Sequence, residues 1–204
     1  MADFCAIRPA NDTETVELAS WCASVFPAIR SSGHSLVKDL YATRATRRAA
    51  GTAMTGMRCV LFFGHGTDTE LLGAQDKALV DSLNIGNASG AIVIAIACSS
   101  GTALGPLAIQ KGVESYLGFD GLFVWLSRDP DGVFQPAITD GIERLITGGD
   151  IDDVRQLIYD GLEAVIDYYQ NGAGSGTTNS TNGWLTAFWS QRHLVLHGYT
   201  AARL

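Results

Sequence analysis

Residues 59–66 have the sequence CVLFFGHG, and residues 91–100 have the sequence AIVIAIACSS. Each begins with an uninterrupted apolar run rich in β-branched and aromatic residues, which is the pattern of a strand buried on both faces of a parallel sheet. Two neighbouring parallel strands need a crossover between them. Residues 76–83 are amphipathic and predict the crossover helix. We therefore expect an α/β fold organised around these two strands.

Apolar runs before and after this pair predict further elements. Strands are expected at residues 4–8, 34–40, 113–119 and 193–199, the third of these continuing through residues 122–126. Helical periodicity predicts helices from an N-cap at Asn11 or Asp12 to Phe26, and over residues 42–54, 134–146 and 151–169. Residues 171–183 have the low-complexity composition of a long flexible loop. The expected architecture is one domain, residues 1–204, with a mainly parallel sheet of about six strands and helices on both faces.

The composition argues against several classes of protein. The 204 residues are 47% hydrophobic and 17% charged, which is enough apolar material for a sizeable core. The formal net charge of -7 argues against nucleic-acid binding. No apolar run is long enough to cross a bilayer, and the N-terminus lacks the pattern of a signal peptide. The four cysteines show no Cys-x-x-Cys spacing, so we expect a cytoplasmic protein with reduced thiols and no bound metal.

One histidine and one cysteine come directly after the two central strands. Ligands and reactive groups of parallel sheets collect at the carboxyl ends of the strands, so we expect His65 and Cys98 to face one crevice. The residues that follow Cys98 have a helical pattern, and a thiolate is stabilised by a helix N-terminus and a nearby imidazole. The amides of Gly66 and Cys98 could form an oxyanion hole. This arrangement predicts a cysteine acyl-transfer site.

Several short motifs in this region resemble a known family. They are Phe63-Gly64-His65-Gly66, Asn84-Ile85, Ala97-Cys98-Ser99-Ser100, Leu104-Gly105 and Gly118-Phe119. In order and strand context they resemble the caspase-like cysteine peptidases, which include caspases, gingipains and separases, and most closely the bacterial CHAT proteases. The resemblance covers residues 58–125. It implies a caspase-like three-layer fold and a cysteine endopeptidase with a Cys98–His65 dyad, a protein substrate and no cofactor.

The resemblance also implies regulation and a specificity pocket. Relatives act in bacterial defence or cell death and stay inactive until a partner or signal orders their substrate loops, so we expect a regulator that acts in trans. Their pocket for the residue before the scissile bond is built from loops after the first strand and near the fifth. The matching positions here are Asp120, Arg8 and Asp12. Asp120 favours a basic substrate residue at that position.

Other interpretations remain open at this stage. The same fold could be a catalytically inactive adaptor that uses the crevice to bind a partner. Residues 101–105 could cradle a phosphate at a helix N-terminus, as in a nucleotide-binding module, although the Lys-Ser/Thr of a P-loop is missing. His193 and His197 are spaced for a metal on a helix, but they fall in a predicted strand with no carboxylate near them in the sequence.

Overall fold

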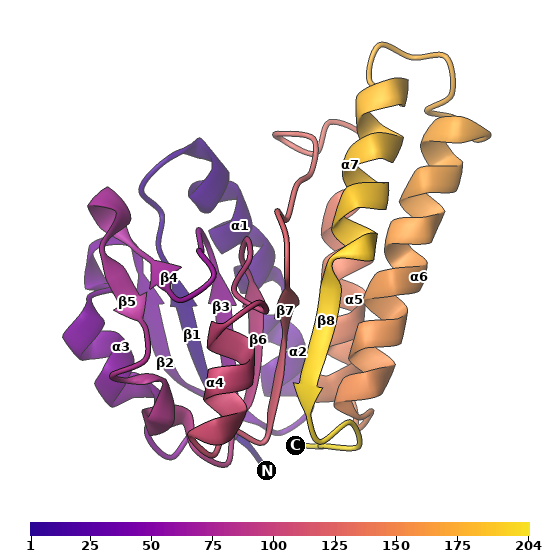
Figure 1. The fold of residues 1–204 in the computed structure, drawn as a ribbon. Coiled ribbons are helices and arrows are strands. Elements are labelled where there is room, and N and C mark those ends of the chain that lie inside the picture. The colour runs from indigo at the N-terminus through magenta and orange to yellow at the C-terminus, as the bar shows by residue number, and fades with distance from the viewer.

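A six-stranded sheet forms the centre of the computed structural model, which describes residues 1–204 (Figure 1). The strand order is β2-β1-β3-β6-β7-β8, and all neighbours are parallel except β7 and β8, which are antiparallel. The predicted α/β class with about six mainly parallel strands is therefore confirmed. The strands are β1 (Asp3–Arg8), β2 (Ser35–Tyr41), β3 (Cys59–Phe63), β6 (Ile92–Ile96), β7 (Ser115–Phe119) and β8 (Leu194–Gly198).

Helices cover both faces of the sheet. One face packs on α1 (Thr13–Ser24), α2 (Phe26–Ser31), α5 (Phe134–Ile146) and α6 (Ile151–Gln170), and the other packs on α3 (Arg47–Met54) and α4 (Leu104–Gln110). In Figure 1, α6 and α7 (Ser180–Arg192) form a long hairpin that rises above the carboxyl ends of the parallel strands. The chain therefore has three layers, with the sheet in the middle.

The uninterrupted apolar run of β3 is explained by burial on both faces. Cys59, Leu61 and Phe63 belong to a core of 33 buried residues on the α1, α5 and α6 side. Val60 and Phe62 belong to a second core of 21 buried residues on the α3 and α4 side. Side chains of a strand alternate between faces. A central strand between two cores therefore has no polar position.

Two helices begin with a reciprocal cap. The Asp12 carboxylate accepts from the Thr15 amide at the start of α1, and the Asp150 carboxylate accepts from the Asp153 amide at the start of α6. Each cap satisfies amides that have no partner within the helix. The predicted N-cap of the first helix is confirmed as Asp12.

The predicted crossover helix over residues 76–83 is wrong. The connection from β3 to β6 instead contains β4 (Leu71–Leu72) and β5 (Ala78–Val80), which pair antiparallel. Gln75 and Asp76 have φ values of 58° and 54°, which a right-handed helix cannot contain. Both helix-forming propensity and amphipathic pattern were overridden here by local turns.

Three other boundaries differ from expectation. The fifth strand, β7, ends at Phe119, and residues 122–126 are irregular instead of extending it. The loop expected over residues 171–183 is shorter, since α7 begins at Ser180. The helix expected over residues 42–54 is interrupted, and α3 begins only after Thr46, whose hydroxyl caps it.

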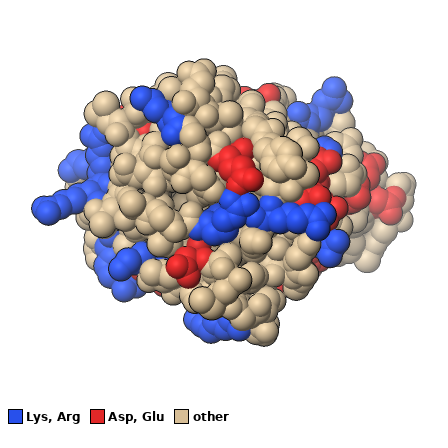
Figure 2. Space-filling view, turned by 90° about the horizontal axis from the view of Figure 1, so that it is seen from below, with Lys and Arg blue, Asp and Glu red and all other residues tan.

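The edge at which the parallel strands begin carries charges of both signs. Figure 2 shows this side with basic and acidic residues interspersed among neutral ones. Arg58, just before β3, pairs with Glu114, and Arg203 pairs with Asp150 at 3.3 Å. No helix of the structure combines the length and the apolar character that a membrane crossing requires.

Close packing of α5 on α6 generates a test of the fold. A Cβ at Gly161 would lie 2.8 Å from both the Cα and the carbonyl oxygen of Ala137. Helix propensity alone would make Gly161→Ala stabilising by about 1 kcal/mol. Because the obstructing atoms are backbone, we expect the opposite, a loss of roughly 1–3 kcal/mol in the free energy of unfolding measured in urea.

Ala164→Gly is the control for this measurement. Ala164 is exposed on the same helix, so its substitution changes propensity without a clash. We expect it to cost about 1 kcal/mol or less. A rise in stability for Gly161→Ala would contradict the close approach of the two helices.

Candidate active site

The register of β3 and β6 places His65 opposite Cys98. Phe63 is opposite Ile96 in this parallel pair. The Gly64 amide donates to the Ile96 carbonyl at 3.1 Å, which continues the pairing past the end of β3. His65 and Cys98 each lie two residues beyond the last pair. The sheet itself therefore brings the imidazole and the thiol to the same level at its carboxyl edge.

His65 and Cys98 line one cavity of about 300 Å³, which we call the Cys98 cavity. Its walls come from the start of α1, from the end of β3 and from the segment after β7. The lining residues are Glu14, Leu18, Gly64, His65, Cys98, Phe123, Val124, Trp125 and Ser127. Five of these nine are hydrophobic. The cavity is thus a mainly apolar recess with a thiol and an imidazole in its wall.

The Cys98 thiol is held in a resting arrangement. Its Sγ donates to the Phe123 carbonyl oxygen, 3.6 Å away. Burial raises the pKa of the Cys98 thiol, and backbone hydrogen bonds offset this only in part. The expected helix does not start at Cys98 but at Leu104, and Ser99 has a φ of 54°. The sequence-based expectation of a helix N-terminus beside the thiol is therefore wrong.

His65 is oriented by a carboxylate. Its Nε2 lies 2.8 Å from Oδ2 of Asp12. The other oxygen, Oδ1, accepts from the Thr15 amide at 2.8 Å and from the Thr15 hydroxyl at 2.7 Å. Partial burial acts to raise the pKa of Asp12, but the bonds from Thr15 and His65 outweigh it and the pKa is lowered. An ionised carboxylate only accepts, so Nε2 carries the hydrogen and neutral His65 has Nδ1 free to take a proton.

Two backbone amides near the thiol make no hydrogen bond to another residue. The N–H of Gly66 has no protein acceptor, and the N–H of Cys98 interacts only with its own thiol, whose pKa it lowers. A Cβ at Gly66 would lie 2.6 Å from the Cys98 carbonyl oxygen, so the two segments approach too closely for any other residue. Free donors in this position are the groups that an oxyanion hole requires.

The three candidates for the specificity pocket all have other partners. Arg8 donates to both oxygens of Asp39 at 2.7 Å, Asp12 contacts His65, and Asp120 contacts Nδ1 of His193 at 2.8 Å. None of the three lines the Cys98 cavity. Its acidic residue is Glu14, in the first turn of α1, which was not among the predicted site residues. Its position two residues after the cap is the signal that could have found it.

Two alternatives from the sequence find little support in the geometry. The amides of residues 101–105 all donate within the protein, so they are not free to cradle a phosphate. His193 contacts Asp120, whereas Nε2 of His197 contacts the Gly101 carbonyl at 2.8 Å. The two histidines thus have separate partners. No group of three or more His, Cys, Asp or Glu side chains is placed to hold a metal.

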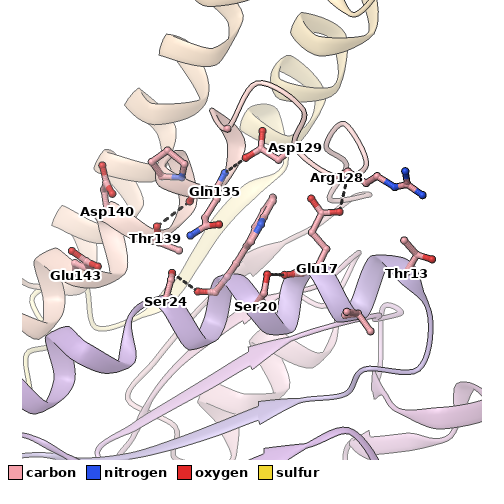
Figure 3. A pocket seen from close by; sticks show the side chains of 14 residues that line it. Thr13, Glu17, Ser20, Ser24, Arg128, Asp129, Gln135, Thr139, Asp140 and Glu143 are labelled. Carbon is pink, nitrogen blue, oxygen red and sulfur yellow. Dashed lines mark hydrogen bonds between the residues drawn. The ribbon is translucent and has the colours of Figure 1, made fainter.

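A larger hollow of about 780 Å³ lies on the other side of α1 (Figure 3). It is lined by neither His65 nor Cys98. Two of its four acidic side chains have partners, since Asp129 accepts from amides at the start of α5 and Glu17 accepts from the Arg128 amide. Asp140 and Glu143 form no hydrogen bond and no ion pair with their side chains, so local capping accounts for only half of the acidic groups of this hollow.

No protein-family model matches the chain, and no curated protein matches its sequence. The geometry of the Cys98 cavity is therefore the main support for a function.

The different burial of the four cysteines predicts that an alkylating reagent modifies only one of them. Cys5, Cys22 and Cys59 are fully buried, and burial raises the pKa of each, that of Cys5 to about 12. We expect iodoacetamide to modify only Cys98 in the folded protein, as measured by mass spectrometry. Because the pKa of Cys98 is also raised, its rate should still increase with pH above about 8.5, where a free cysteine is half ionised.

Cys98→Ser and free cysteine are the controls for alkylation. The variant should remain unmodified until the protein is unfolded. Modification of Cys59 at a comparable rate would contradict the burial of β3. The alkylation rate of Cys98 should reach its plateau at a higher pH than that of free cysteine. A plateau at a lower pH would contradict a thiol that is kept protonated by burial.

Proposed function

We propose that the chain is a cysteine endopeptidase with Cys98 as the nucleophile and His65 as the general acid/base. The observation that carries the proposal is the β3–β6 register, which sets the two side chains opposite each other in one cavity. The amides of Gly66 and Cys98, neither of which donates to another residue, add support. The motifs around these residues resemble those of caspase-like peptidases, most closely the bacterial CHAT branch.

In the proposed reaction, Cys98 transfers its proton to Nδ1 of His65. The thiolate forms a bond to the carbonyl carbon of the peptide, and the carbonyl π electrons move to its oxygen. The amides of Gly66 and Cys98 donate to this oxyanion. The C–N bond then breaks while His65 gives its proton to the leaving amine. Water, deprotonated by His65, attacks the thioester, which releases the carboxylic acid product and restores the Cys98 thiol.

Asp12 has a positioning role in this proposal. Its carboxylate holds the hydrogen on Nε2, so that Nδ1 is the nitrogen that exchanges protons. It also stabilises the imidazolium that forms when Cys98 is deprotonated. Thr15 fixes the carboxylate through two hydrogen bonds.

We further propose that the protease is regulated in trans, in bacterial defence or cell death, as the resemblance implies. The bond from Cys98 to the Phe123 carbonyl supports a resting form. Phe123 belongs to the irregular segment after β7, which also supplies Val124, Trp125 and Ser127 to the cavity wall. Displacement of this segment by a regulatory protein or by substrate would release the thiol toward His65.

A catalytically inactive partner-binding protein is the second candidate. The observation that favours it is the same raised pKa of Cys98, because a protonated thiol is a poor nucleophile. In that case the Cys98 cavity would hold a partner side chain without chemistry.

The dyad is tested by single substitutions. We expect Cys98→Ala to abolish cleavage and His65→Ala to reduce it by roughly 10²–10⁴-fold, the usual contribution of general acid/base catalysis. New protein N-termini formed in a bacterial lysate, counted by mass spectrometry against the wild type, measure this.

His193→Ala is the matched control, because His193 contacts a carboxylate at 2.8 Å but does not line the Cys98 cavity. It should cleave the same sites as the wild type. Equal cleavage by wild type and Cys98→Ala would rule out the nucleophile and leave the partner-binding function as the better explanation.

The positioning role of Asp12 is tested by Asp12→Asn. Asparagine caps a helix about as well as aspartate, so α1 should remain intact. We expect kcat to fall roughly tenfold or more, because the amide cannot stabilise an imidazolium, while KM is unchanged since Asp12 does not line the cavity. Steady-state kinetics on one cleaved peptide give both constants. An unchanged kcat would show that His65 does not depend on Asp12.

A further inference from the structure

We propose that the Cys98 cavity takes a basic substrate side chain, the Lys or Arg before the scissile bond, and that Glu14 is its counter-charge. The inference rests on the proposed function and adds a substrate class to it. It replaces Asp120 with Glu14 as the residue that selects a basic side chain.

The charge of the cavity wall is the first support. Besides the reactive pair, Glu14 is the ionisable residue among its lining side chains, and no Lys or Arg is present there. Glu14 makes no hydrogen bond and no ion pair with its side chain, whereas Asp12 is already engaged by His65 and Thr15. An exposed carboxylate that lines an apolar recess attracts a cation and repels an acidic side chain.

The shape and chemistry of the walls are the second support. Leu18, Phe123 and Trp125 provide apolar surface, and the rings of Phe123 and Trp125 stack with centroids 5.4 Å apart. Lys and Arg have methylene stems that pack on apolar surface while their charged ends reach polar groups. The carboxylate of Glu14 is such a group. A purely apolar side chain would fill the recess without an attraction to Glu14.

No basic residue of the protein competes for Glu14 in the structure. Arg8 is committed to Asp39 through both carboxylate oxygens. Arg128 follows the cavity residue Ser127 but lines the hollow between α1 and α5 instead of the Cys98 cavity, and its side chain forms no ion pair (Figure 3). The N-terminus of α1 carries a partial positive charge that offsets part of the negative charge of Glu14, but it is smaller than one unit charge. The net charge beside the cavity thus remains negative.

Peptidyl acyloxymethyl ketones that differ only in the last residue test the proposal. The thiolate of Cys98 forms a bond to the methylene carbon of such a probe and displaces its carboxylate, so each reaction leaves a stable adduct of known mass. Four probes ending in Lys, Arg, norleucine and Glu are compared. Norleucine has the length and apolar stem of Lys without the charge. The measured quantity is the rate of adduct formation on Cys98, in lysate-treated wild type, Glu14→Gln and Glu143→Gln.

Glu143→Gln is the matched control, because Glu143 lines the separate hollow between α1 and α5. In wild type and in this control we expect the Lys and Arg probes to react roughly tenfold or more faster than norleucine, and the Glu probe to be slowest. In Glu14→Gln the basic advantage should fall to about threefold or less, with the norleucine rate unchanged. Glu14→Lys should reverse the order of the Lys and Glu probes.

The outcomes separate this inference from the proposed function. Cys98 adducts with no preference for basic probes, or a preference that survives in Glu14→Gln, would overturn the role of Glu14 while the cysteine peptidase stands. No adduct on Cys98 from any probe would contradict the peptidase itself, and the basic specificity would fall with it.

Discussion

The parallel pairing of β3 with β6 is the constraint on which the rest of the molecule depends. The backbone register of this pair places His65 and Cys98 at equivalent positions just beyond the two strands, independently of the contacts that their side chains make. Both strands are buried on both faces, so a slip of one residue would exchange the two cores and is strongly disfavoured. The relative position of the two strand ends, from which His65 and Cys98 follow, is therefore held by the whole hydrophobic core. The loops around them can differ widely without changing that relation.

Much of this arrangement could be predicted because it follows from local pattern. The runs at residues 59–63 and 91–97 are long enough and apolar enough to predict central strands, and parallel strands present their ends at one edge. The N-cap at Asp12 was visible as an acidic residue before a helical stripe. Each of these features depends on residues near one another in the sequence. The α/β class and the level placement of His65 and Cys98 follow from them.

The parts that escaped prediction have two causes, local turns and contacts between distant segments. The stretch at residues 76–83 has a helical pattern, but left-handed residues at Gln75 and Asp76 and the pairing of β5 with β4 replace the helix with a short hairpin. The contacts of Asp12 with His65 and of Asp120 with His193 join residues far apart in the chain. The family resemblance placed both aspartates in a specificity pocket. Only the folded chain shows that each already has a histidine partner.

The double attachment of Asp12 couples the site to the first turn of α1. The same carboxylate caps the helix through Thr15 and holds the ring of His65. The ends of helices open far more often than the strands of a core. Each opening of this turn would set the imidazole free to rotate while the sheet remained intact. In the proposed peptidase, activity would then be lost at a lower temperature than the fold, and the difference between the two temperatures would be set by one helix cap.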